Sequence, residues 1–357
     1  MNDRGGHAVR DLDQRRGWAR VRAAAACLAG VAVFAVTAAG VVAIALGAAA
    51  RFWSWVSGTG FDDFALWSWL PGGAAALAGL AVIVSFLGAF WYFWWGASPQ
   101  VLREIGAQPL AREHGPVLYN VVEALSIGIG RPMPDLCVVD DPAPNALSLR
   151  GRRRRVLVVT RGCADLGRDE LEAVCAHELG HLWADDAHWV TSGMVALARA
   201  SRFGRLLLVL GMAVLILAAY VTLEGHAFLW GVGLTGLALV VLGFLSSSVL
   251  RRLELSVRRH ADEIADVAAI NLAKNPTALG AACAQLAAHG GRVTRTGWRC
   301  ELMWFELLEE SDPTDPRGEE LNARSHRELV DRAVAAYATA KVPLPESVAT
   351  LRALYPA

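Results

Sequence analysis

Four long runs of apolar residues limit what this chain can fold into. The runs cover residues 23–50, 71–95, 206–223 and 227–250, and none of them contains a charged residue. A helix of about 20 apolar residues is long enough to cross the hydrocarbon core of a bilayer. Buried core helices are the alternative interpretation, but such helices are usually shorter than these runs. We therefore predict four transmembrane helices, in agreement with a chain that is 54% hydrophobic and only 19% charged.

The distribution of arginine predicts how these helices are oriented. Six arginines precede the first run, and the segment between the second and third runs carries Arg152–Arg155. The short connection between the first two runs instead holds Arg51 against Asp62 and Asp63. Lysine and arginine concentrate on the cytoplasmic side of membrane proteins. We therefore predict a multi-pass protein of the cell (inner or plasma) membrane, with both termini and the central segment in the cytoplasm.

The strongest chemical signal is the motif His177-Glu178-Leu179-Gly180-His181. Histidines four residues apart project from one face of a helix, so their imidazoles can bind one zinc ion together with a third ligand and a water. Glu178 lies beside the first histidine, where a carboxylate can take a proton from water that attacks a carbonyl. A chance pair of histidines is the alternative interpretation. The many acidic residues of segment 169–186 argue against a helix inside the membrane.

The segment after the fourth run offers a third metal ligand. Asp262 and Asp266 are one helical turn apart on one face, so one carboxylate can bind the metal while the other orients a ligating histidine. Glu263 projects about 100° away from that face. His260 is a suitable zinc ligand in kind, but it has no carboxylate at the same spacing. Both stay open as alternatives to Asp262, and a charged helix face without metal is a further one.

The segment between the second and third runs also predicts a small β-sheet. Residues 136–139 form a short apolar run, and residues 143–149 and 156–160 flank a turn that contains glycine. Two such runs joined by a short turn predict a β-hairpin. Arg150 and Arg152–Arg155 occupy the turn, and a basic turn is usually a solvated surface that faces anionic headgroups. Selection of acidic substrates is the alternative.

This ordered set of motifs resembles the HtpX-like membrane zinc metallopeptidases, the family that also includes the CAAX prenyl proteases. Pro144–Leu147 is similar to the family's P-N-A-F edge strand, and Val158–Thr160 to the strand that follows it. His177–His181 matches the H-E-x-G-H helix, and Asp262–Asp266 matches the E-x-x-A-D segment. The resemblance extends over roughly residues 132–332. It implies one zinc ion per chain, held by the last two motifs.

The chain departs from the family pattern at three positions. Asp262 replaces the family's glutamate ligand, and its shorter side chain requires the helix to approach the metal by about 1.5 Å. Leu147 replaces an aromatic residue. His326 and Arg332 are similar to a late His-Pro segment and its arginine, which are thought to steady the oxyanion in the family, but Arg327 replaces the proline. A surface helix that carries histidine and arginine is the alternative interpretation.

We predict an α+β integral membrane protein. Four transmembrane helices carry a mainly helical cytoplasmic metallopeptidase domain of the zincin type, which contains a small β-sheet. A basic N-terminal segment (1–22) precedes the first transmembrane pair (23–97). The first part of the domain (98–204) contains the H-E-x-x-H motif. The second part (251–357) follows the second transmembrane pair (205–250) and contains the third metal ligand.

The expected function is zinc-dependent hydrolysis of peptide bonds by a membrane-bound endopeptidase. In this prediction His177, His181 and Asp262 bind one Zn²⁺ per chain. Asp266 supports a ligand from behind, and Glu178 activates the attacking water.

The expected substrates are polypeptides, in particular membrane or misfolded proteins. An extended substrate adds to the edge strand at Asn145, Ala146, Leu147 and Ser148 through main-chain hydrogen bonds. The bilayer is the other partner, whereas the zero net charge gives no general attraction to nucleic acid. A CAAX-type prenyl-peptide protease is an alternative, although such an enzyme is expected to have more spans around a closed chamber. A membrane zinc sensor or scaffold without activity is disfavoured by the presence of Glu178.

Overall fold

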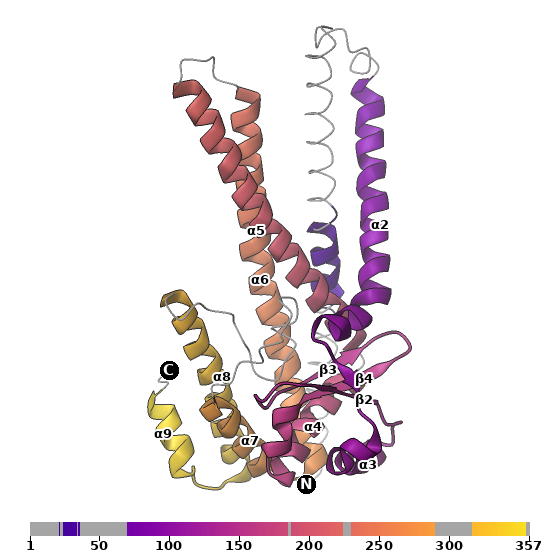
Figure 1. The fold of residues 1–357 in the computed structure, drawn as a ribbon, viewed down its shortest axis with the longest axis vertical. Helices are drawn as coiled ribbons and strands as arrows, with labels where there is room; N and C mark the ends of the chain where they lie inside the picture. Colours follow the sequence, from indigo (N-terminus) through magenta and orange to yellow (C-terminus); the bar gives the residue numbers. More distant parts are fainter. Residues whose placement is uncertain are drawn as a thin grey trace, which may run out of the picture. The chain divides into compact units, whose positions relative to one another are not determined.

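The computed structural model describes residues 21, 24–33, 35, 70–184, 187–223, 230–289 and 316–354 (Figure 1). The larger described helices are α2 (Leu70–Glu104), α3 (Pro116–Ile129), α4 (Arg168–Trp183), α5 (Ala187–Leu223), α6 (Trp230–Ala273), α7 (Pro276–His289), α8 (Pro316–Ala340) and α9 (Glu346–Leu354). The strands are β1 (Gln108–Pro109), β2 (Asp135–Val139), β3 (Ala146–Arg150) and β4 (Arg155–Thr160). The predicted class, mainly helical with a small sheet, is confirmed.

The chain divides into two compact units. One unit, called here the sheet unit, comprises residues 1–24, 95–195 and 254–357. The other, called the helical unit, comprises residues 25–94 and 196–253. Helices α2, α5 and α6 each continue from one unit into the other.

Two of the described helices are long and apolar enough to cross a membrane. They extend over Ala187–Tyr220 in α5 and Gly236–Ala273 in α6, and their most apolar windows have mean hydropathies of 2.2 and 1.5. Only 22% and 28% of these windows are buried inside the protein. A core helix of a soluble protein would be mostly buried, so the exposed apolar side chains indicate contact with lipid. They include Leu206, Val209, Leu210, Ile216, Leu217, Leu237, Val241, Phe244, Leu245 and Val249.

The first pair of predicted spans is described only in part. The run 23–50 lies largely outside the described residues, and the described residues 24–33 and 35 are helical. The run 71–95 lies within α2, whose side chains are described from Ile83 onward. Ile83 and Trp91 are exposed there. Among the described residues, two apolar helices are therefore long enough to cross a membrane. The first pair of spans stays a prediction.

Glycines let α5 and α6 pack closely within the helical unit. Gly204 and Gly211 are seven residues apart on α5, and Gly236 and Gly243 are seven apart on α6. A Cβ atom at Gly243 would lie 2.5 Å from the Gly204 carbonyl oxygen, and one at Gly211 would lie 2.8 Å from that of Gly236. Transmembrane helices associate through such small residues because close backbone packing replaces the hydrophobic driving force that lipid removes.

The sheet has the strand order β1-β2-β4-β3, so β3 lies at an edge. β4 pairs with β2 in parallel and with β3 in antiparallel orientation, with Leu147 opposite Val158. The predicted hairpin is thus confirmed, as is the strand at 136–139. The two-residue strand β1 at the other edge was not predicted, because Gln108 and Pro109 carry no strand pattern.

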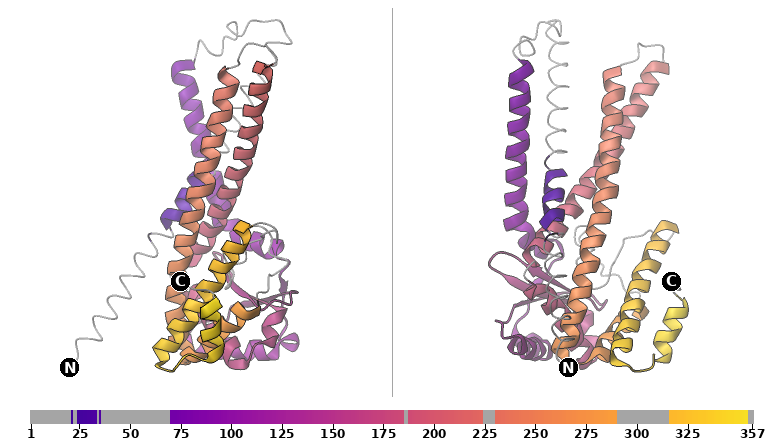
Figure 2. Two further views of the ribbon diagram at one scale, coloured as in Figure 1. Left: turned by 90° about the vertical axis from the view of Figure 1, so that its left-hand side faces the viewer. Right: turned by 180° about the vertical axis from the view of Figure 1, so that it is seen from behind.

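Helix α4 forms the centre of the sheet unit. It packs against β3 and β4 on one side and against α3 and α7 on others. Almost every residue from Leu171 to Leu179 is therefore buried, and not only the single stripe expected from its helical spacing. The remaining helices α7, α8 and α9 pack against one another (Figure 2). This packing buries the first part of the H-E-x-x-H motif, from His177 to Leu179, in the core.

Candidate metal centre

Helix α4 brings the two histidines of the motif together. His177 and His181 project from one face, and their Nε2 atoms lie 3.0 Å apart. The His177 side chain is fully buried, and His181 lies at the edge of the core. The rings meet nearly edge to face, at an interplanar angle of 85°. Both imidazoles thus direct a ring nitrogen to one point, as two ligands of a single ion would.

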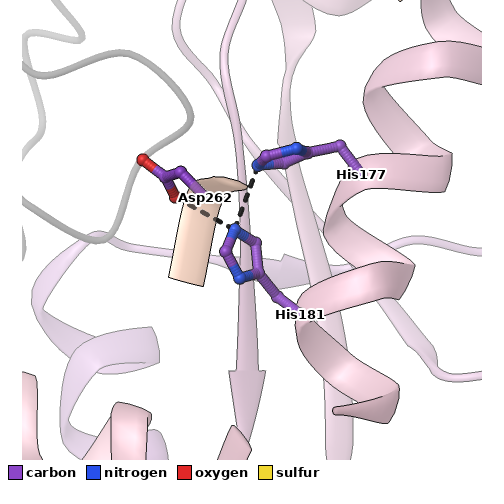
Figure 3. A group of neighbouring side chains, drawn as sticks. All are labelled: His177, His181 and Asp262. Carbon is purple, nitrogen blue, oxygen red and sulfur yellow. Dashed lines mark hydrogen bonds and ion pairs between the residues drawn. The ribbon is translucent and has the colours of Figure 1, made fainter. Parts of the chain in front are cut away.

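Asp262 of α6 completes a group of three possible metal ligands. Its Oδ1 atom lies 3.2 Å from Nε2 of His181 (Figure 3). The donor atoms of His177, His181 and Asp262 all lie within 4.8 Å of one another, and no other such group occurs among the described residues. Glu263, the alternative ligand, is exposed on another face of α6. His260 instead contacts the Ser256 carbonyl oxygen through Nδ1, at 3.0 Å.

Gly180 explains how the shorter aspartate reaches the histidines. A Cβ atom at this position would lie 3.0 Å from the Ala268 Cβ and 3.2 Å from the Ala265 Cα of α6. A larger residue in the motif would therefore push α6 away from α4. Glycine on one helix and alanines on the other allow the close approach that an aspartate ligand requires.

Asp266 lies behind His177 and fixes the orientation of its ring. The His177 Nδ1–H group donates a hydrogen bond to Oδ1 of Asp266, at 2.8 Å. This bond places the proton on Nδ1 and leaves the Nε2 lone pair facing His181. Asp266 is thus in the position that the sequence predicted for a carboxylate supporting a ligand.

Arg332 of α8 holds the same carboxylate from the other side. Its guanidinium group donates to both oxygens of Asp266, at 2.6 Å from Nη2 and 2.9 Å from Nε. The Nη2 atom lies 3.2 Å from His177 Nδ1, because both groups donate to Oδ1. Arg332 therefore lies on the Nδ1 side of the ring, whereas the possible metal ligands meet at Nε2. The oxyanion role that the family resemblance implies for Arg332 stays a prediction.

His326 lies on another face of α8. It precedes Arg332 by six residues, which corresponds to about 240° around a helix. Its side chain is partly buried, and burial lowers the pKa of its imidazole. The role that the family resemblance implies for His326, steadying the oxyanion, also stays a prediction.

Arg258 contacts the remaining oxygen of Asp262, and sequence reasoning missed it. Its Nε donates to Oδ2 at 3.1 Å, and the Arg258 side chain is only 5% exposed. Since Oδ2 is bound to Arg258, Oδ1 is directed toward His181. The four-residue spacing between Arg258 and Asp262 was the signal that could have identified this pair.

The surroundings of the two histidines shift their pKa values in opposite directions. Burial, and then the positive charge of Arg332, lower the pKa of His177 to about 4. Burial opposes protonation of His181 too, but the hydrogen bond to Asp262 and the charges of Glu178 and Asp262 raise its pKa overall. His177 therefore stays neutral, as a metal ligand must, far below neutral pH.

The two aspartates stay ionised despite their burial. Burial alone would raise the pKa of the Asp262 carboxyl, but Arg258 and His181 hold it well below its usual range. Arg332 and His177 do the same for Asp266. The centre thus offers two imidazole nitrogens and negatively charged oxygen, a donor set that suits zinc.

Glu178 is buried between the histidines and strand β3, with an exposed fraction of 2%. Burial raises the pKa of its carboxyl, whereas a hydrogen bond from the Ser148 side chain lowers it. A carboxylate with a raised pKa is a stronger base than an exposed one, and this property suits a group that accepts a proton from water. Ser148 lies in the predicted substrate strand, so the structure connects that strand with the predicted base.

The backbone at the edge of β3 is open only over a short stretch. Two backbone hydrogen bonds of 2.9 Å show which residues of β3 are hydrogen-bonded to β4: Thr160 N–H donates to Asn145 O, and Gly151 N–H donates to Arg154 O. Along an antiparallel strand, such residues alternate with residues whose backbone groups point outward. In this alternation Leu147 bonds to β4, and the backbone groups of Ser148 and Arg150 point outward. At Arg150 the outward amide donates to Thr191 Oγ1 at 3.2 Å. The start of α5 therefore closes one end of the edge.

The other predicted substrate-binding residues differ in their surroundings. Asn145 is fully buried, and its Oδ1 accepts a hydrogen bond from the Ala146 amide at 2.9 Å. The Ala146 and Leu147 side chains are buried as well. Ser148 is partly exposed. A substrate strand would therefore meet main-chain groups here, with Ser148 as the most accessible side chain.

Comparison with known proteins agrees with this geometry. The sequence model of "Peptidase family M48" matches residues 115–339, more than half of the chain. The "Protease HtpX homolog" of Dictyoglomus turgidum is 30% identical over 216 residues, which cover 59% of this chain and 68% of that protein. The homologue of Dictyoglomus thermophilum is 29% identical over 224 residues (61% and 71%). That of Tropheryma whipplei is 30% identical over 222 residues (60% and 68%). The chain therefore belongs to peptidase family M48, as an HtpX-like metallopeptidase.

Proposed function

We propose that this chain is a zinc-dependent endopeptidase, bound to the membrane, that hydrolyses membrane or misfolded proteins. The observation that carries the proposal is the convergence of His177, His181 and Asp262 beside the buried carboxylate of Glu178. Membership of a peptidase family agrees with this arrangement.

The donor set fits zinc. Two ligands of a tetrahedral zinc ion are separated by about 3.4 Å, given Zn–N and Zn–O distances near 2.1 Å. The separations of 3.0 Å between the histidine nitrogens and 3.2 Å between His181 and Asp262 are close to this value. When bound, zinc would act as a Lewis acid toward the scissile carbonyl and lower the pKa of water. His177, His181 and Asp262 would hold it, with Asp266 and Arg258 fixing two of the three ligands.

Glu178 would act as the general base and then as the general acid. Its carboxylate accepts a proton from the attacking water and delivers that proton to the leaving nitrogen. The raised pKa that burial gives this group supports both steps, because the protonated form is then easier to reach. The Ser148 side chain keeps the carboxylate oriented toward the edge of the sheet.

The substrate would bind in extended form along β3. Main-chain hydrogen bonds to the outward groups of Ser148 tolerate many sequences, which suits proteolysis of diverse unfolded chains. At Arg150 the edge is occupied, because the amide bonds to Thr191 and the carbonyl oxygen contacts Nδ1 of His188 at 3.1 Å. The added strand is therefore short, and specificity depends on only a few substrate residues.

The proposed protein crosses the membrane four times, and two of these spans are the apolar helices described above. The apolar exposed surfaces of α5 and α6 support spans in the second pair. The uncharged runs at 23–50 and 71–95 support a first pair. The arginine distribution supports a cytoplasmic position for both termini and for the catalytic residues, where the enzyme would meet misfolded chains.

The proposal is tested by metal removal. Purified full-length protein should cleave an unfolded model protein such as reduced casein, lose this activity on dialysis against a zinc chelator, and regain it when zinc is added back. The variant His181→Ala should not regain activity, whereas His114→Ala, an exposed histidine outside the centre, should behave like the native protein. Activity that persists without metal would contradict the proposal.

A further inference from the structure

The turn between β3 and β4 presents three adjacent guanidinium groups. Arg152, Arg153 and Arg154 are all exposed. None of the three forms an ion pair with a carboxylate in the described part of the chain. The Gly151 amide donates to the Arg154 carbonyl oxygen at 2.9 Å and closes the turn. We call residues 151–154 the basic turn.

The base of the hairpin is fixed to the end of α4, so the turn is held in one place. Arg155 lies over the Trp183 ring, with its guanidinium carbon 4.2 Å from the ring centroid. The Arg150 side chain donates to the Ala184 carbonyl oxygen at 3.0 Å. These contacts order the two residues that flank the turn, so binding of a ligand by the turn does not first require ordering of the hairpin.

The basic turn contacts α2 where its apolar run ends. The Arg152 guanidinium carbon lies 4.2 Å from the centroid of the Trp95 ring. A Cβ atom at Gly151 would lie 3.3 Å from Oγ of Ser98. Trp95 is the last residue of the run 71–95, and the polar residues Ser98 and Gln100 follow it in α2. The turn is therefore attached to the residue at which α2 would leave the hydrocarbon core.

The aromatic residues at this level of α2 are of the kind found at membrane interfaces. Trp91 and Tyr92 are exposed in the preceding turn of the helix. The Arg199 side chain donates to the Tyr92 hydroxyl at 2.7 Å. Tryptophan and tyrosine concentrate at the headgroup level because their rings are amphipathic, and arginine near helix ends extends its charge to the same level.

We propose that the basic turn binds the phosphate groups of anionic phospholipids in the cytoplasmic leaflet. The inference rests on the proposed membrane placement of α2. A guanidinium group donates two parallel hydrogen bonds to phosphate oxygens, and adjacent guanidiniums can bind one or two headgroups. Stacking of Arg152 on Trp95 keeps one of them at the lipid surface. The bound lipid would fix the hairpin, and with it the substrate edge of β3, at a constant distance from the membrane.

Lipid binding to full-length protein in a neutral detergent tests the proposal. Native mass spectrometry measures the apparent Kd for phosphatidylglycerol and phosphatidylcholine added separately. The native protein should bind phosphatidylglycerol more tightly. The triple variant R152Q/R153Q/R154Q should lose this preference, with the Kd for phosphatidylglycerol rising on the order of 10- to 100-fold at low salt. The single change Trp95→Leu, which removes the stacking partner, should have an intermediate effect.

A matched control removes three exposed cations elsewhere in the sheet unit. In R168Q/K341Q/R352Q the net charge changes equally, but the basic turn is intact, so the preference for phosphatidylglycerol should persist. An equal loss in this control, or a preference that survives in the turn variant, would overturn the proposal. Because the readout needs no hydrolysis, absence of peptidase activity would leave its result unaffected.

Acidic substrate segments are the competing ligand for the turn. This alternative is tested by measuring kcat/KM of the native protein and of the triple variant for matched acidic and neutral peptides, in detergent without anionic lipid. The proposal predicts that the triple variant changes neither value by more than about twofold. A selective loss for the acidic peptide, with lipid binding unchanged, would assign the turn to substrates and refute the proposal.

Discussion

Replacement of Asp262 should weaken zinc binding far more than replacement of its neighbour Glu263. Asp262 Oδ1 lies 3.2 Å from His181 Nε2, whereas the Glu263 side chain is exposed on another face of the helix. Four-ligand structural zinc sites are worth about 10–16 kcal/mol, or roughly 2.5–4 kcal/mol per ligand. Loss of one ligand should therefore raise the zinc Kd about 100- to 1,000-fold. Removal of the exposed carboxylate should change the Kd by no more than about twofold.

Asp262→Asn and Glu263→Gln are the matched variants. Both keep the size of the side chain, and the amide oxygen of an asparagine can still accept the hydrogen bond from Arg258. The zinc Kd is measured by competition with a fluorescent chelator at fixed pH. Asp262→Glu adds a methylene and should keep the metal bound if α6 can move outward from Gly180. Loss of zinc from Glu263→Gln together with normal binding by Asp262→Asn would refute the assignment of the ligand.

Three further predictions concern other residues of the site and the membrane topology. Arg332→Met leaves the Asp266 carboxylate without its cation in a partly buried site, so stability should fall by about 3–5 kcal/mol; an unchanged melting temperature of the apoprotein would contradict this. Glu178 must be ionised to accept a proton, and burial raises its pKa, so turnover should decline with falling pH already above 4.5, the ordinary value; a pH–rate profile that stays flat below that value would exclude it as the base. An impermeant thiol reagent on intact cells should label Thr59→Cys and leave Arg153→Cys unlabelled, and the reverse pattern would invert the proposed topology.

The local parts of the structure could be predicted from the sequence. The two histidines needed only helical spacing to converge, and the register of Asp262 and Asp266 followed from a one-turn separation. The β3–β4 hairpin followed from two apolar runs around a short turn. In each case the residues that decide the arrangement are close together in the chain, so the periodicity of one element was enough.

Contacts between distant segments could not be predicted in the same way. Arg332 binds Asp266 across 66 residues of sequence, and nothing in either helix pattern specifies that pairing. Thr191 closes the edge of β3 at Arg150 across 41 residues. The close approach of α6 to Gly180 depends on how α4 packs in the core. Such arrangements result from tertiary packing, which periodicity within one element does not encode.

The most direct test of the central claim is the activity of Glu178→Gln. Zinc content and turnover of an unfolded model substrate are measured on the same preparation of full-length protein. We expect zinc to stay bound, since Glu178 is not among the three grouped ligands. Turnover should fall by at least the 10²- to 10⁴-fold typical of the loss of a general base. Glu263→Gln, an exposed carboxylate one residue from Asp262, is the control and should retain native activity. Near-native hydrolysis by zinc-loaded Glu178→Gln would contradict the proposed mechanism.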